Sequence, residues 1–258
     1  MPIRPCRTAC TVVVALAAFL NAASHAHAAD VTVVTAGAFK PVLLALAPAY
    51  EARTHTTLAI SNDTAGGVAA RVQRGEAIDL VILPTQALNT LAAQGKVVAE
   101  TVTPVAKAGI GAVVKQGAPV PDISSVEAFK QTLLAVPSIA YVDPAAGASS
   151  GIYLAKLFDR MGIGDAIRRK TVLVPGGLVA SRVANGEVAL GLQQISELRA
   201  VSGVTFVGPL PAELQNYTIY AAAIPASAQS PAAGRALLAQ LRSEAAEQAL
   251  KASGLEHP

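Results

Sequence analysis

The sequence predicts an α/β fold in which mostly parallel sheets are flanked by helices. Short runs rich in β-branched residues alternate with longer segments of helix-like content, and this order is typical of βαβ units. One segment of the first half, which begins at Gly66-Gly67, is repeated in the second half from Gly176-Gly177. The 258 residues suffice for one large domain or two small ones, so the repeat favours two lobes of similar build.

The first half opens with a β-branched run, VTVVT at 31–35, which has the length of a buried strand. A helix-like segment follows, and Pro48 inside it is expected to kink or shorten that helix. Asn62, Asp63 and Thr64 supply cap residues for the next helix. The expected strands are 31–35, 56–61 and 80–83, and the expected helices are 39–54, 65–74 and 85–94.

The second half continues the same alternation and ends in an Ala-rich amphipathic segment, which predicts one long helix. The expected strands are 111–115, 138–142, 171–174, 189–193, 205–207 and 217–224, and the expected helices are 125–132, 150–161, 177–184 and 231–253.

Both copies of the repeat read GG, then ARV or ASRV, then GE, and each precedes an expected strand. Arg71 and Arg182 occupy equivalent positions, where a solvated helix face is favoured over a ligand clamp. Two lobes that each place a helix N-terminus at a shared cleft would explain the repeat. Chance similarity in an Ala-, Gly- and Val-rich chain is the alternative.

Residues 1–28 are predicted to be a secretory signal peptide. Arg4 and Arg7 precede ten apolar residues at 11–20, and Ala26-His27-Ala28 supplies an A-x-A cleavage pattern. The apolar run is shorter than the roughly 20 residues that a membrane-spanning helix needs. We therefore expect cleavage near Ala28 and a soluble protein in the periplasm.

Removal of this segment would take away both cysteines, Cys6 and Cys10, so the mature chain would have no disulfide and no cysteine metal site. Cys10 precedes the apolar run in a poor lipobox, which argues against a lipid anchor. Without two arginines the basic residues fall from 20 to 18 against 17 acidic residues, a net charge of +1. A nearly neutral chain is not a nucleic-acid binder by charge.

The mature chain has few residues that suit catalysis, because His55 and His257 are its only histidines. A Ser-His-Asp triad or a histidine-rich metal site is therefore poorly supported, and no P-loop, G-x-S-x-G or H-E-x-x-H is present. We expect a protein that is not an enzyme and that uses no cofactor and no metal. A secreted enzyme and the ligand-sensing domain of a regulator remain the alternatives.

Several segments resemble a known family. They are 35–39 (TAGAF), 62–67 (NDTAGG), 74–82, 143–151 with 161–163, and 185–198. In these the chain resembles type II periplasmic substrate-binding proteins, especially divergent relatives of the molybdate-binding proteins of ABC importers. The resemblance implies a monomer with lobe one at 29–107 plus 221–258, lobe two at 108–220, and a permease partner in the inner membrane.

This resemblance also implies that a small anion binds between the lobes, held by hydroxyls and backbone N–H groups. Helix N-termini present free N–H donors and the positive end of the helix dipole. The candidate ligand is a molybdate- or tungstate-like oxyanion or a small carboxylate. The candidate ligand-binding residues are Gly37, Ala38, Phe39, Thr64, Ala65, Gly66, Ser149, Ser150, Gly151, Gly176 and Gln194.

The chain departs from the family pattern at three places. Gly37 or Ala38 stands where the family has a serine, Thr64 or Ala65 matches the second serine only approximately, and Gln194 replaces a tyrosine. The loss of hydroxyls favours a somewhat larger anion or an organic acid. A purely structural role remains the alternative for several candidates, above all helix capping by Ser149 and Ser150.

Overall fold

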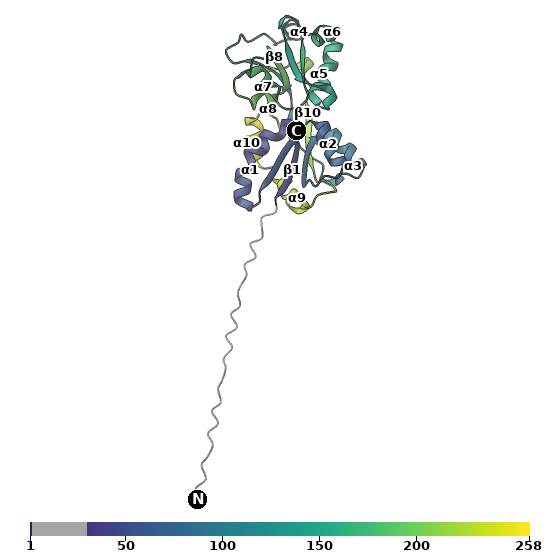
Figure 1. Cartoon of the computed structure of the whole chain (residues 1–258), viewed down its shortest axis with the longest axis vertical. Helices are drawn as coiled ribbons and strands as arrows, with labels where there is room; N and C mark the ends of the chain where they lie inside the picture. The colour runs from purple at the N-terminus through teal and green to yellow at the C-terminus, as the bar shows by residue number, and fades with distance from the viewer. Residues whose placement is uncertain (2–29) are drawn as a thin grey trace.

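The computed structural model describes Met1 and residues 30–258, so the rest of the predicted signal peptide, its cleavage site and both cysteines lie outside the described residues. Two lobes lie end to end, and each is built around its own five-stranded sheet (Figure 1). Within residues 30–258, every helix is too short or too polar to cross a bilayer.

Lobe one combines the N-terminal part of the chain with its C-terminal part. Its strands are β1 (Val31–Ala36), β2 (Leu58–Asp63), β3 (Leu80–Pro84), β4 (Thr103–Ala108) and β10 (Thr218–Ala223). Its helices are α1 (Lys40–Thr54), α2 (Ala65–Gln73), α3 (Thr85–Ala93), α9 (Pro231–Gln240) and α10 (Glu244–Ala252), with short 3-10 turns η1 (Gly37–Phe39) and η2 (Ala99–Thr101). The strand order is β2-β1-β3-β10-β4, and β10 runs antiparallel to both of its neighbours.

Lobe two is formed by the middle of the chain. Its strands are β5 (Ile110–Lys115), β6 (Ile139–Val142), β7 (Thr171–Val174), β8 (Leu190–Gln194) and β9 (Val204–Pro209). Its helices are α4 (Val126–Ala135), α5 (Ser149–Arg160), α6 (Gly164–Arg168), α7 (Val179–Ala184) and α8 (Ile195–Arg199), with turns η3 (Pro144–Ala146) and η4 (Ala212–Leu214). The strand order is β7-β6-β8-β5-β9, and β5 is the antiparallel strand.

The two sheets have the same construction, which gives the internal repeat a structural meaning. In each sheet the second strand of the order is parallel to both of its neighbours. This strand is β1 in lobe one and β6 in lobe two. Helices α2 and α7, which carry the two copies of the repeat, lead into β3 and β8 at equivalent places in the two sheets. The alternation of strands and helices therefore predicted the fold class correctly, although both sheets are mixed.

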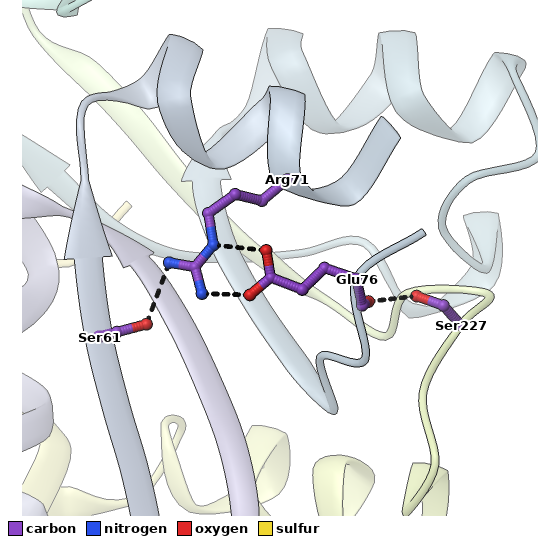
Figure 2. Close-up of polar contacts among 4 residues, drawn as sticks. All are labelled: Ser61, Arg71, Glu76 and Ser227. Atoms are coloured by element: carbon purple, nitrogen blue, oxygen red, sulfur yellow. Dashed lines mark hydrogen bonds and ion pairs between the residues drawn. The ribbon is translucent and has the colours of Figure 1, made fainter. Parts of the chain in front are cut away.

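The repeated arginines bind the repeated glutamates. Figure 2 shows the Arg71 guanidinium donating to both carboxyl oxygens of Glu76 and to Ser61 Oγ. The Glu76 carbonyl in turn accepts from Ser227 Oγ at 2.7 Å, which ties the loop after α2 to the C-terminal part of the chain. In lobe two, Arg182 and Glu187 pair at 2.6 Å in the same way. These arginines hold a helix to the loop that follows it.

The chain crosses between the lobes twice. Gly109 alone separates β4 from β5, and residues 210–217 connect β9 to β10. The Gln215 side chain joins the two crossings, because its amide both accepts from Ile110 N and donates to Ile110 O, each at 2.9 Å. The lobe boundaries expected after Lys107 and before Ala221 fall inside strands β4 and β10. We therefore propose Gly109 and residues 210–217, which lie between strands, as the hinge.

Some element boundaries differ from expectation. Pro48 lies inside α1, which continues to Thr54, so the proline does not shorten the helix. The expected helix 231–253 is two helices, because Ser243 caps a new one by accepting from Ala246 N. Helices α6 and α8 and strand β4 were not predicted. The carboxyl of Asp79 accepts from three backbone N–H groups, of Thr32, Gln229 and Ser230, which makes it a structural residue.

Candidate functional site

A pocket lies where the two lobes meet, at the ends of β1, β2, β6 and β8. Its cavity volume is about 30 Å³, room for about one water molecule. A larger ligand therefore enters only when the lobes move apart. The residues that line this interlobe pocket are Ala36, Gly37, Ala38, Asn62, Asp63, Thr64, Ala65, Val142, Ala148, Ser149, Gly177, Gln193, Gln194, Glu197 and Tyr220.

The lobes touch beside the pocket through two glycines. Gly66 N, at the start of α2, donates to Gly147 O at 3.1 Å. A Cβ atom on Gly147 would lie 2.9 Å from Gly66 Cα, and Gly147 has a φ of +73°. Thr64 Oγ1 adds a donated bond to Ala146 O at 2.5 Å, while it also caps α2 by accepting from Gly67 N. This close approach of two backbones holds the lobes in a closed arrangement.

Neutral hydrogen-bonding groups form one wall of the pocket. Gln194 Nε2 donates to Ser149 Oγ at 3.0 Å and lies 3.2 Å from the Tyr220 hydroxyl. Tyr220 comes from β10 of lobe one, so this network crosses between the lobes. Burial raises the pKa of Tyr220 above its ordinary value of 10.0, which keeps the hydroxyl protonated. Ser149 also begins α5, whose first N–H groups have no intrahelical acceptor.

Glu197 adds a buried carboxyl to the lining of the pocket. It lies on α8 of lobe two and is 8% exposed, and within residues 30–258 no hydrogen-bond donor or cation is paired with it. Burial raises its pKa from 4.5 to about 8, because there is no compensating charge. Gly37 of lobe one lies against it so closely that a Cβ at position 37 would overlap Glu197 Oε1. The missing side chain at Gly37 leaves room for this carboxyl.

The pocket has no basic side chain among its lining residues, which include the acids Asp63 and Glu197. Positive potential comes from the N-termini of α2 and α5. The described residues also hold no group of three or more His, Cys, Asp and Glu side chains that could bind a metal ion. The arrangement suits a ligand that accepts hydrogen bonds and exchanges protons with the protein.

The structure brings part of the predicted site together. Six of the predicted residues line the pocket: Gly37, Ala38, Thr64, Ala65, Ser149 and Gln194. The other five lie nearby without lining it. Phe39 is in the core of lobe one and Ser150 is buried. Gly66 packs on Gly147, and Gly151 packs on the Val142 carbonyl. The pocket is lined by Gly177 and not by the predicted Gly176.

The structure excludes the alternative of helix capping by the two serines. Ser149 and Ser150 do not cap α5, because its N-cap residue is Ala148 and no side-chain hydrogen bond caps the helix. Gln193 and Gln194 at the end of β8 are both buried. Gln193 fixes the start of α7 by accepting from Val179 N at 2.9 Å and donating to Gly177 O at 3.0 Å.

Sequence reasoning missed Glu197 and Tyr220. Glu197 belongs to a segment that carried the family resemblance, but a single acidic residue in a short helix gives no sign of burial. Tyr220 lies in a strand that was expected, and its position in the sheet decides that it reaches the pocket. A tyrosine hydroxyl is thus present beside Gln194 although Gln194 replaces the family tyrosine.

A sequence profile described as bacterial extracellular solute-binding protein matches residues 31–256. The chain belongs to this family. Among solved structures of this fold, the Azotobacter vinelandii periplasmic molybdate-binding protein is 19% identical, with a TM-score of 0.73 over 89% of this chain and 100% of that one. The substrate-binding domain of a putative molybdenum ABC transporter from Clostridium difficile is 15% identical, with a TM-score of 0.67 over 89% of this chain and 99% of that one.

A curated relative has a different kind of name. A Pseudomonas protein named aconitate isomerase is 39% identical over 252 residues, which are 94% of this chain and 95% of the relative. The solute-binding family and its fold are those of binding proteins. A sulfate-binding protein from Mycobacterium tuberculosis has the same fold, with 18% identity and a TM-score of 0.70 over 90% of this chain and 87% of that one. Proteins that bind different ligands therefore share this fold.

Proposed function

We propose that this protein binds a small polycarboxylate between its lobes and isomerises it, with aconitate as the first substrate to test. The observation that carries the proposal is the interlobe pocket with titratable groups in its wall, in a chain that is 39% identical to a protein named aconitate isomerase. The proposal departs from the sequence-based expectation of a protein without catalytic activity.

The chemistry needs no cofactor. Aconitate is a propene tricarboxylate with cis and trans forms, and a CH₂ group lies next to its double bond. When a base removes one of these protons, the electron pair spreads over three carbons and into the carboxylates. Return of a proton to the far carbon restores the double bond in its new position, where either geometry can form. The protein must supply a proton carrier and hydrogen-bond donors for the carboxylates.

The pocket wall contains donors of the required kind. Ser149 and Tyr220 carry hydroxyl groups, and α5 begins at Ser149 with free N–H groups. Such donors stabilise a carboxylate and the charge that develops during proton removal.

Incubation of the purified mature chain, residues 29–258, with trans-aconitate tests this proposal. Proton NMR of the mixture is expected to show growth of cis-aconitate signals until the ratio of isomers is constant. The same ratio should be reached from cis-aconitate. Absence of conversion from both starting isomers, with a folded protein, would refute the isomerase.

The alternative function is delivery of a small organic anion to an ABC permease of the inner membrane. The solute-binding family favours it, as does the pocket between two lobes that must separate to admit a ligand. Calorimetry with both aconitate isomers, citrate, molybdate, tungstate and sulfate distinguishes the ligand classes. Binding of an oxyanion in preference to the carboxylates would favour transport and contradict the isomerase.

We further propose that the protein acts in the periplasm after removal of residues 1–28. The family description supports an extracytoplasmic location, and the A-x-A pattern at residues 26–28 supports cleavage there. The mass of the protein recovered from a periplasmic fraction is expected to correspond to residues 29–258. A protein that keeps residues 1–28 in the cytoplasm would contradict this location.

A further inference from the structure

Three titratable side chains line the interlobe pocket: Asp63, Glu197 and Tyr220. An isomerase of the proposed kind needs one of them to accept a proton from carbon and to return it. The three differ in burial and in the hydrogen bonds that they already make, and these differences distinguish their roles.

Asp63 and Tyr220 are engaged elsewhere. Asp63 is exposed, and its Oδ1 accepts from Thr64 N at 2.6 Å, so it holds the turn that leads into α2. The Tyr220 hydroxyl is within hydrogen-bond distance of Gln194 Nε2 and Ser149 Oγ. Because its buried hydroxyl keeps its proton, Tyr220 is suited to donate a hydrogen bond to a substrate carboxylate.

Glu197 differs from both. It is 8% exposed at the contact between the lobes, and none of the hydrogen bonds and ion pairs among the described residues involves its carboxyl. The carboxyl oxygens are not among the fully buried side-chain atoms that lack a partner, which are Ser150 Oγ and Ser196 Oγ, so the surface that they keep faces the pocket that Glu197 lines. A carboxyl that is largely removed from water without a partner is costly to maintain, and a structural role gives no reason for it. The opposite lobe accommodates this carboxyl, since Gly37 has no side chain where any Cβ would overlap Glu197 Oε1.

We propose that Glu197 is the catalytic residue that carries the proton between the two carbons, and that Gly37 is a glycine because this carboxyl occupies the space of its side chain. The assignment rests on the proposed isomerase function. The Glu197 carboxylate takes a proton from the CH₂ carbon as that C–H bond breaks. The resulting carboxyl gives a proton to the other terminal carbon as the new C–H bond forms, and the carboxylate is regenerated.

The test compares Glu197→Gln and Glu197→Asp with the wild type, and Glu100→Gln is the matched control. Glu100 lies exposed in η2, outside the pocket and outside the proposed hinge. Glutamine matches the shape and neutral charge of a protonated glutamate, so Glu197→Gln is expected to bind trans-aconitate with nearly wild-type affinity by calorimetry. Its turnover by proton NMR is expected to fall by at least about 100-fold, since general acid–base groups contribute about 10²–10⁴.

Glu197→Asp keeps a carboxyl on a side chain that is one methylene group shorter, so its turnover is expected to lie between those of the wild type and Glu197→Gln. Glu100→Gln is expected to match the wild type. Turnover by Glu197→Gln at the wild-type rate would overturn the assignment while leaving the isomerase intact. Loss of binding and turnover together in both Glu197 variants would show a binding or structural role and would overturn it too. A wild type without turnover would refute the isomerase itself.

Discussion

At the scale of single residues, Glu197 shows how burial changes the chemistry of a common side chain. A carboxyl that leaves water without a compensating donor favours its protonated form, and its pKa rises from 4.5 to about 8. The neutral form therefore dominates at pH 7, while a minority of molecules carry the carboxylate that can accept a proton, and the pKa lies near the pH at which acid–base catalysis works best. The same shift links the stability of the fold to pH.

The first prediction is that stability falls as pH rises from about 5 to about 8. In that range the unfolded chain has lost the Glu197 proton while the folded chain keeps it, so each step to higher pH favours unfolding. The contribution of Glu197 to stability is fully present below the unfolded pKa of 4.5 and is lost as the pH rises through about 8. Urea unfolding of the mature chain at several pH values measures the slope.

The control for this slope is Glu197→Gln, in which the buried group is neutral at every pH. The variant is expected to lose most of the fall in stability between pH 5 and 8. Tyr220 does not titrate in this range, because its pKa is raised above 10.0. An unchanged slope in Glu197→Gln would mean that the carboxyl is not buried in solution as it is in the structure.

At the scale of elements, the residue that caps a helix N-terminus can also form a contact between the lobes. Ser125 and Ser243 cap α4 and α10 by accepting a backbone N–H. Their side-chain hydrogen bonds stay within their own lobe. Thr64 caps α2 in the same way but also donates to Ala146 O in the other lobe. The cap of α2 is therefore also a contact that depends on whether the lobes are closed.

The second prediction compares Thr64→Ala with Ser125→Ala. Each is expected to lower the free energy of unfolding by about 1 kcal/mol through loss of the cap, as urea titration would show. Only Thr64→Ala also removes a contact between lobes, so it alone is expected to weaken the binding of trans-aconitate in calorimetry. Equal affinities in the two variants would indicate that the Thr64–Ala146 bond does not contribute to closure.

At the scale of the whole molecule, we propose that function depends on the movement of two lobes about Gly109 and residues 210–217. The pocket holds about one water molecule, so the proposed six-carbon ligand would enter an open form and be enclosed afterwards. A ligand that touches both lobes shifts the population toward closure. The backbones of Gly66 and Gly147 are in contact in the structure, and we propose that this contact forms on closure.

The third prediction is that Gly147→Ala hinders closure while Gly162→Ala does not. Both glycines have positive φ, of +73° and +70°, so alanine costs each about 1–2 kcal/mol of stability. A Cβ at Gly162 meets nothing within 4 Å, whereas one at Gly147 meets Gly66 Cα. Affinity for trans-aconitate is expected to fall at least about tenfold, equivalent to about 1.4 kcal/mol, in Gly147→Ala alone. Equal losses in both variants would contradict this mechanism of closure.

The sequence by itself determined the fold class, the order of most elements and the helix N-termini at the lobe contact. Periodicity, β-branched runs and cap residues are local properties that can be recognised in the sequence. The repeat around Gly66 and Gly176 predicted two lobes of similar build. Boundaries were less well predicted where a local cap such as Ser243 interrupts a continuous amphipathic pattern.

Only the tertiary structure decided which groups meet in the pocket. Glu197 and Gly37 are far apart in the chain and in different lobes, and Tyr220 reaches Gln194 because β10 returns to the first sheet. Burial depends on all the atoms that surround a residue, so the raised pKa of Glu197 has no local signature in the sequence. Six residues that the sequence predicted line the pocket, and the packing of two lobes places beside them the carboxyl that we propose carries the proton.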